Sequence, residues 1–116
     1  MSHATRRSFL KLTAAMLCAG GAQTSAVQEL PALDGQLHDD LSTRQAAATD
    51  WGGHVHRAPV AVLTPASVAD VVRIVKYANQ RRLKIAMRGQ GHSVYGQAQV
   101  DGGIVIDSRT LNAIKW

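Results

Sequence analysis

The sequence is short of cysteine, with a single one, Cys18, among its 116 residues. A disulfide needs a second cysteine and a thiolate metal site needs several, so we expect neither. Cys18 lies in an apolar N-terminal segment and follows Leu17, whereas the lipid-acceptor cysteine of an exported lipoprotein follows a small residue. We therefore expect no lipid anchor and no metal.

Concentrated positive charge is also missing from most of the chain. The formal net charge is +5, but residues 1–26 contain Arg6, Arg7 and Lys11 and no acidic residue. The rest has 13 minus 3, or 10, basic residues against 8 acidic ones, which leaves +2 with no run longer than Arg81-Arg82. A nucleic-acid-binding surface needs clustered basic residues, so we expect no nucleic-acid partner.

No hydrophobic run is long enough for a stable membrane anchor. The apolar segment from Leu12 to Ala22 is short and rich in Ala and Gly. It follows Thr5-Arg6-Arg7-Ser8-Phe9-Leu10-Lys11, which resembles the twin-arginine signal of bacterial exported proteins. Thr24-Ser25-Ala26 would suit cleavage. We expect residues 1–26 to be a signal peptide read by the twin-arginine export machinery, and the protein to be periplasmic or secreted.

Residues 27–50 are interpreted as a loose lead-in, because they show poor periodicity and predict only a short helix around 41–48. Three apolar runs, 59–64, 83–87 and 104–107, predict strands. Asp50-Trp51-Gly52-Gly53 indicates a turn. His54-x-His56 follows it, but two histidines without further ligands nearby do not make a metal site, so we expect solvated loop residues.

A helix is predicted between the first two of these strands. Ser67 suits its N-cap, with Asp70 three residues on. Four valines and an alanine recur at helical spacing and are expected to form the buried stripe: Val68, Val71, Val72, Val75 and Ala78. The resulting strand–helix–strand unit predicts an α+β fold and places residues 88–97 in the loop that leaves the second strand.

This loop is rich in glycine and contains the sequence from Arg88 to Gln97. Loops at the carboxyl ends of strands commonly bind ligands in α/β structures. A dinucleotide fingerprint beginning at Gly89 and Gly91 would need a third glycine where the chain has Val94, and no Lys-Ser or Lys-Thr pair follows to make a P-loop. Neither of these familiar phosphate-binding motifs is present.

Residues 48–112 resemble a flavoprotein family. The resemblance rests on Arg88-Gly-x-Gly-His92-Ser93, on Gly96-Gln97-Ala98 and on Gly102-Gly103-Ile104-Val105-Ile106-Asp107. It is to the PCMH-type FAD-binding domain of the vanillyl-alcohol-oxidase-like flavoproteins, most closely the cytokinin dehydrogenases. It implies FAD as the cofactor and makes residues 51–116 the N-terminal, incomplete part of that domain.

The resemblance also implies roles for individual residues. His92 would bond covalently to the flavin, while Gly89, Gln90 and Gly91 would offer backbone N–H groups to the pyrophosphate. Further cofactor contacts would come from Ser93 and Gln97. The role of Arg88 is left open, because it could pair with phosphate or stabilise the loop. No catalytic residue is expected in this part of the sequence.

The function implied is that of an FAD-dependent oxidoreductase that oxidises a C–N or C–O bond of a small-molecule substrate by hydride transfer. Enzymes of this family are several times longer, so we expect the chain to be an N-terminal fragment that is inactive alone. Two alternatives stay open: a small exported anion- or nucleotide-binding domain without redox activity, and a non-functional truncated remnant.

Overall fold

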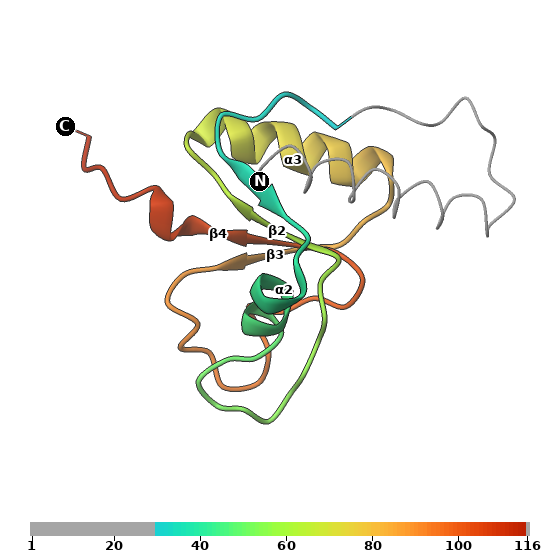
Figure 1. The fold of residues 1–116 in the computed structure, drawn as a ribbon. Helices are drawn as coiled ribbons and strands as arrows, with labels where there is room; N and C mark the ends of the chain where they lie inside the picture. The colour runs from blue at the N-terminus through green and yellow to red at the C-terminus, as the bar shows by residue number, and fades with distance from the viewer. Residues whose placement is uncertain (1–29, 116) are drawn as a thin grey trace, which may run out of the picture.

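The computed structural model describes residues 30–115, in which a four-stranded sheet carries one helix on each side (Figure 1). The predicted signal peptide lies outside the described residues. In chain order the elements are β1 (Gln36–His38), α2 (Leu41–Ala47), β2 (Ala61–Thr64), α3 (Val68–Gln80), β3 (Ile85–Arg88), β4 (Ile104–Asp107) and the 3-10 helix η2 (Ser108–Thr110). Within this range no helix combines the length and the apolar character needed to cross a membrane.

The strand order in the sheet is β1-β2-β4-β3. β1 runs antiparallel to β2, whereas β4 lies between β2 and β3 and is parallel to both. The carboxyl ends of the parallel strands therefore meet at one edge of the sheet, where Arg88 is the register partner of Asp107. This arrangement confirms the α+β class predicted from the sequence.

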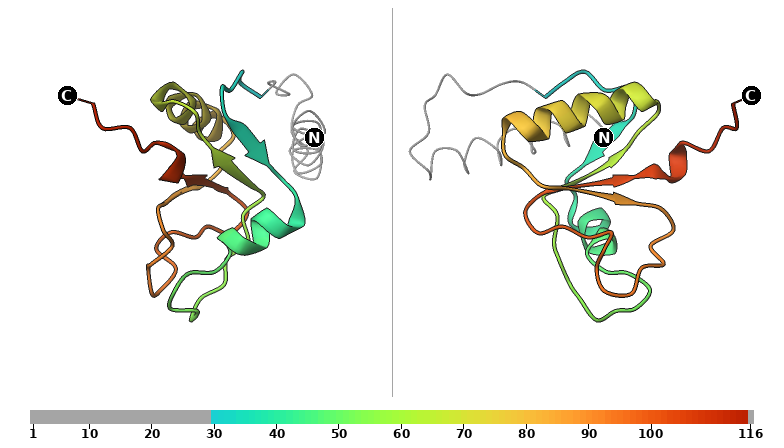
Figure 2. Two further views of the ribbon diagram at one scale, coloured as in Figure 1. Left: turned by 60° about the vertical axis from the view of Figure 1, so that its left-hand side comes forward. Right: turned by 180° about the vertical axis from the view of Figure 1, so that it is seen from behind.

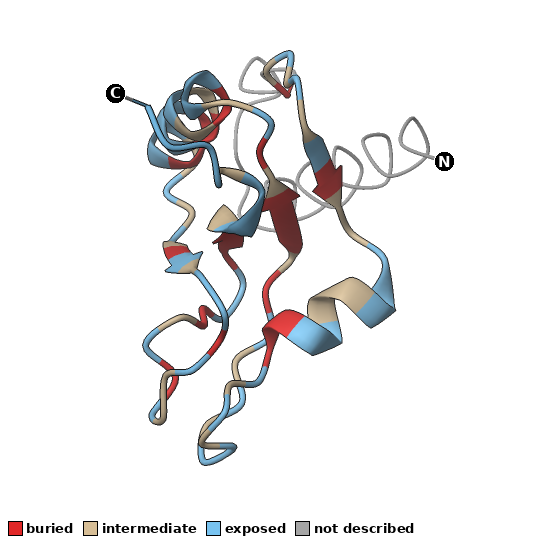
Figure 3. Ribbon diagram, turned by 90° about the vertical axis from the view of Figure 1, so that its left-hand side faces the viewer, coloured by how far each residue is buried: buried red, intermediate tan, exposed pale blue. Residues whose placement is uncertain are grey.

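The two central strands, β2 and β4, are buried along most of their length (Figure 3), and successive residues on each strand belong to two different core clusters. Leu63 of β2 and Ile106 of β4 belong to one cluster with Ile74 of α3. Val62 and Val105, one residue earlier on each strand, belong to a second cluster on the α2 side. Burying each large aliphatic side chain contributes about 1.5–3 kcal/mol, so these short strands are held mainly by packing.

The predicted helix is confirmed as α3, and the Ser67 hydroxyl accepts a hydrogen bond from the Asp70 N–H as an N-cap. The predicted buried stripe is right only in part, because Ala78 is buried and Val71 packs against the core but the other three valines are exposed. Val68, Val72 and Val75 are 64%, 46% and 44% exposed, and the buried residues are Asp70, Ile74, Tyr77 and Ala78. The helix carries apolar residues on two neighbouring stripes, and the wider side chains of Ile74 and Tyr77 fill the space over the sheet.

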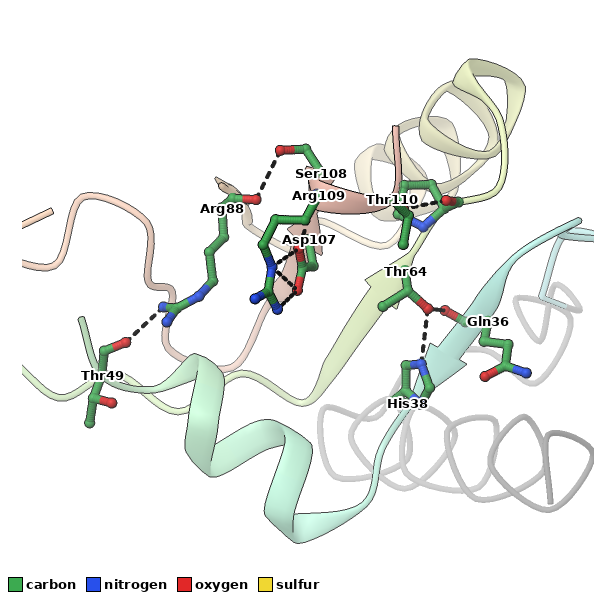
Figure 4. A network of polar contacts seen from close by, with 10 residues as sticks. Gln36, His38, Thr49, Thr64, Arg88, Asp107, Ser108, Arg109 and Thr110 are labelled. Atoms are coloured by element: carbon green, nitrogen blue, oxygen red, sulfur yellow. Dashed lines mark hydrogen bonds and ion pairs between the residues drawn. The ribbon is translucent and has the colours of Figure 1, made fainter. Parts of the chain in front are cut away.

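The lead-in is more ordered than the sequence predicts. Its helix is confirmed as α2, but residues 36–38 form β1, where Leu37 is buried and pairs with Leu63. The His38 ring makes a 2.9 Å hydrogen bond with the Thr64 hydroxyl (Figure 4). A three-residue strand has too little periodicity to be visible in the sequence, and its partner lies 26 residues away.

Candidate functional site

The candidate site consists of two loops that lie side by side below the sheet (Figures 1 and 2). One is the glycine-rich loop between β3 and β4, and the other connects α2 to β2. Backbone bonds join them: the Trp51 N–H donates to the Gly91 carbonyl at 2.8 Å, and the Gly52 N–H donates to the Ser93 carbonyl at 3.2 Å. The two flanks of His92 are thus paired with the turn predicted at residues 50–53.

Arg88 lies at the start of the glycine-rich loop and stabilises it. Its guanidinium donates to the Thr49 carbonyl at 2.7 Å, and its own carbonyl accepts from the Ser108 hydroxyl at 3.0 Å (Figure 4). The guanidinium also packs against Gly91, because a Cβ placed on that glycine would overlap it. Of the two roles left open by the sequence, these contacts support the stabilising one.

The loop has the properties of an anion-binding cradle. Among residues 30–115, no group accepts a hydrogen bond from the backbone N–H of Gly89, Gln90, Gly91 or His92. Gly91 has φ of +75°, and a Cβ on Gly89 would meet only open space. Unpaired amides beside a guanidinium attract a phosphate group. The residues present therefore fit the pyrophosphate of a dinucleotide cofactor.

His92 is exposed in the middle of this loop. Its ring makes no hydrogen bond with any residue that the structure describes, which leaves both ring nitrogens available to a ligand. The Ser93 hydroxyl is already engaged, donating to Asp50 at 2.9 Å. The Gln97 side chain is exposed, and its Oε1 accepts from the Tyr95 N–H at 3.0 Å. Five of the six predicted cofactor-binding residues thus lie together on residues 89–93, and Gln97 is turned back on its own loop.

Asp50 contributes to the site, although the sequence assigned it no role in cofactor binding. Its carboxylate accepts from the Ser93 hydroxyl, from the Gly96 N–H at 2.8 Å and from the Gly53 N–H at 3.2 Å. Burial alone would raise the pKa of Asp50, but the hydrogen bonds from Gly96, Ser93 and Gly53 outweigh burial and lower it. In the sequence Asp50 belongs to a turn and to the triplet Asp50-Trp51-Gly52, which resembles the Asp-aromatic-Gly lead of the flavoprotein family. Neither signal predicts its contacts, because its partners lie 43 and 46 residues away.

A second carboxylate, Asp107, lies at the carboxyl end of β4 and is already neutralised. Arg109 donates from Nε at 2.9 Å and from Nη2 at 2.5 Å to the two oxygens of Asp107 (Figure 4). These bonds lower the pKa of Asp107 despite its burial. The pair therefore places no net charge beside Arg88, the neighbour of Asp107 in the sheet.

The two histidines at 54 and 56 lie in the loop that connects α2 to β2. His54 stacks on Tyr95 with ring centroids 5.5 Å apart, and both histidines are exposed, as predicted. Nowhere in residues 30–115 do three potential metal-binding side chains of His, Cys, Asp or Glu come together.

Comparison with known proteins gives relatives of one kind. A family model described as FAD binding domain matches residues 59–116. The chain is 40% identical over 82 residues to an uncharacterized oxidoreductase of the fasciation locus of Rhodococcoides fascians, covering 71% of this chain and 19% of the relative. It is 38% identical over 117 residues to cytokinin dehydrogenase 9 of Oryza sativa subsp. japonica, covering 90% of this chain and 22% of the relative.

Solved structures agree with these sequence matches. The fold is similar to that of 6-hydroxy-D-nicotine oxidase from Arthrobacter nicotinovorans, with a TM-score of 0.64 and 35% identity over 72% of this chain and 19% of the other. It is also similar to BBE-like 1 from Physcomitrella patens, with a TM-score of 0.61 and 27% identity over the same shares. The chain thus spans about a fifth of the length of these proteins.

Proposed function

The chain belongs to the FAD binding domain family, and from this premise we propose that it is the N-terminal part of an FAD-dependent oxidoreductase with the flavin bound covalently to His92. The observation that carries the proposal is the exposed His92 ring within a loop whose neighbouring amides have no acceptor among residues 30–115. A neutral imidazole is a competent nucleophile near pH 7. The His92 imidazole therefore lies next to the backbone N–H groups that would bind the phosphates of the cofactor.

Each predicted contact then has a defined part in holding the cofactor. The backbone N–H groups of Gly89, Gln90 and Gly91 bind the pyrophosphate. The Ser93 hydroxyl donates to Asp50, so it contacts the cofactor as an acceptor through its remaining lone pairs. Gln97 reaches the cofactor only if its amide leaves the Tyr95 N–H, and this exposed side chain has the freedom to do so.

The proposed reaction is the oxidation of a C–N or C–O bond in a small-molecule substrate. When bound, FAD supplies the redox chemistry by accepting a hydride, which carries two electrons, from the carbon attached to nitrogen or oxygen. Residues 30–115 bind and orient the cofactor, and we assign them no catalytic residue. Relatives named for cytokinin and for 6-hydroxy-D-nicotine support substrates with a carbon–nitrogen bond.

A ring nitrogen of His92 would hold the flavin covalently at its 8α carbon. Forming this bond would replace one C–H bond of the 8α methyl group and the imidazole N–H bond. That change is a two-electron oxidation, and an external acceptor such as dioxygen would take up the two electrons and two protons. We expect the bond to raise the flavin potential and to prevent loss of the cofactor outside the cell.

Replacing the histidine tests this proposal directly. The wild-type full-length protein should keep yellow colour and flavin fluorescence after acid denaturation and gel electrophoresis, whereas His92→Ala should lose both. His54→Ala removes another exposed loop histidine and should keep them. Wild-type protein without flavin fluorescence on the denatured chain would refute the covalent bond.

We also propose that the folded protein is exported from the cytoplasm. The Arg6-Arg7 pattern supports the twin-arginine export machinery as a partner and a periplasmic or secreted location, reached after the cofactor is bound and the chain folded. Changing both arginines to lysine should leave the flavoprotein in the cytoplasmic fraction. Unchanged periplasmic recovery of that variant would contradict this proposal.

A further inference from the structure

We propose that Asp50 is a positioning residue whose segment, Thr49–Gly53, holds both residues that flank His92 and thereby fixes the imidazole for bonding to the flavin. We call Thr49–Gly53 the clamp segment. The inference rests on the covalent attachment proposed above and adds a residue that acts on it from outside the glycine-rich loop.

The clamp segment contacts the loop on either side of His92. On the N-terminal side, the Trp51 N–H donates to the Gly91 carbonyl at 2.8 Å. On the C-terminal side, the Gly52 N–H donates to the Ser93 carbonyl at 3.2 Å, and the Ser93 hydroxyl donates to Asp50 at 2.9 Å. Both neighbours of His92 are therefore fixed by groups from one short segment.

Close backbone packing makes this contact specific. A Cβ on Gly52 would overlap the backbone of Val94, so the segment approaches the loop more closely than any side chain would allow. Arg88 adds a further bond by donating to the Thr49 carbonyl at 2.7 Å. The clamp segment is thus attached to the loop at its beginning, at Arg88, and as far along as Gly96, whose N–H donates to Asp50.

The clamp segment makes no hydrogen bond to the ring or the N–H groups that the cofactor would use. The His92 ring makes no hydrogen bond with any group in the described range, and neither do the backbone N–H groups of residues 89–92. The contacts to Gly91 use its carbonyl, and those to Ser93 use its carbonyl and hydroxyl. None of the contacts of the clamp segment therefore uses the His92 ring or the N–H groups of residues 89–92, which stay available to the cofactor.

Such fixing matters because bond formation depends on the alignment of the reacting atoms. A misplacement of about 1 Å can slow a reaction about 100-fold. Asp50 is the side chain on which the arrangement depends, since one of its oxygens accepts from both Ser93 and Gly96. An asparagine would either put an N–H₂ group against those two donors or turn it towards Gly53.

The test measures flavin attachment in full-length apoprotein mixed with FAD, followed by fluorescence of the denatured chain over time. We expect Asp50→Asn to lower the attachment rate at saturating FAD by about 10-fold or more, while the half-saturating FAD concentration stays within about twofold. The matched control is Asp101→Asn, whose carboxylate likewise accepts a backbone N–H across two loops, from Ala58 at 2.8 Å. It should attach flavin at the wild-type rate.

A second substitution separates positioning from general destabilisation. Ser93→Ala should slow attachment, and adding it to Asp50→Asn should slow it no further, because Asp50→Asn has already disrupted the hydrogen bond from the Ser93 hydroxyl. Attachment by Asp50→Asn at the wild-type rate would overturn the inference, as would equal slowing in Asp101→Asn. If wild-type protein attaches no flavin, the covalent bond itself is refuted. Amide hydrogen exchange then tests the clamp segment independently of flavin. If Asp50 holds the two loops together, the N–H groups of Trp51, Gly52 and Gly96 should exchange faster in Asp50→Asn, but not in Asp101→Asn, than in wild type.

Discussion

Gly91 is a residue at which both backbone conformation and packing exclude a side chain. Its φ of +75° lies in the left-handed region, which costs other residues about 1–2 kcal/mol. A Cβ would also overlap the Arg88 guanidinium, which is fixed by its bond to Thr49. We expect Gly91→Ala to lower the free energy of unfolding by about 2 kcal/mol or more and to weaken FAD binding, both measurable by denaturant titration with and without FAD.

Gly89 is the control for this prediction within the same loop. The φ of Gly89 is not positive, and a Cβ there would meet nothing within 4 Å. Gly89→Ala should therefore change the free energy of unfolding by no more than about 0.5 kcal/mol. Equal stability losses in the two variants would show that glycine content alone, rather than the contact with Arg88, stabilises the loop.

The sequence predicted the residues of the glycine-rich loop but not the residue that holds them. His92 and its neighbours form a continuous motif, so their likeness to a family was visible without a structure. Asp50 is separated from Ser93 by 43 residues, and the sequence marks it only as part of a turn and of a triplet, Asp50-Trp51-Gly52, that resembles one in the family. Its role depends on a pairing of two loops, which no local pattern encodes.

Among the secondary-structure elements, α3 depends on a buried carboxylate. Asp70 is fully buried and accepts N–H groups from Asp34 at 2.8 Å, Gly35 at 2.8 Å and Ala66 at 2.9 Å. It also pairs with Arg73 at 3.2 Å. The first turn of α3 is thereby joined to the chain that enters β1 and to the end of β2.

We expect Asp70→Asn to lower the free energy of unfolding by roughly 2–3 kcal/mol, because an amide N–H₂ would face backbone donors. Burial alone would raise the pKa of Asp70, but its hydrogen bonds outweigh burial and lower the pKa below the usual 3.8. A lowered folded-state pKa stabilises the protein above the unfolded value, and this stability is lost as pH falls through the folded one.

Urea denaturation at about pH 6 and about pH 3 checks both parts of this prediction. The wild-type protein should lose more stability on acidification than Asp70→Asn does. Asp34→Asn is the control, because Asp34 is exposed and its bond to Arg73 is a surface ion pair, worth about 0–1 kcal/mol. Identical acid dependence in wild type and Asp70→Asn would contradict the proposed role of the carboxylate.

The same helix illustrates what an element's sequence can and cannot specify. Its bounds and N-cap follow from Ser67 and from helical periodicity, and both were predicted. Its buried face was predicted only in part, because Val68, Val72 and Val75 also recur at helical spacing although they are exposed. Asp70 lies on the buried face, and a carboxylate is buried only where several donors converge on it, as three backbone N–H groups do here.

For the whole molecule, the α+β class followed from the alternation of apolar runs, but the strand order did not. The sequence predicted a strand–helix–strand unit from β2 to β3, and these strands are not neighbours because β4 lies between them. Placing β4 at the centre buries Ile104, Val105 and Ile106 on both faces. Their continuous apolar run is typical of a central parallel strand, and this signal could have predicted the central position of β4.

Cofactor binding should stabilise the whole protein in a way that distinguishes a covalent flavin from a dissociable one. A ligand that binds only the folded state at about 100 times its dissociation constant adds about 2.7 kcal/mol. We expect the melting temperature of His92→Ala to rise as FAD is added, because its amide cradle from Gly89 to Gly91 is intact and its flavin exchanges with solution. With the covalent flavin proposed above, the wild-type protein would already be saturated and should melt at a temperature independent of added FAD. If the melting temperature of His92→Ala did not change on addition of FAD, the loop would not bind the cofactor without the covalent bond.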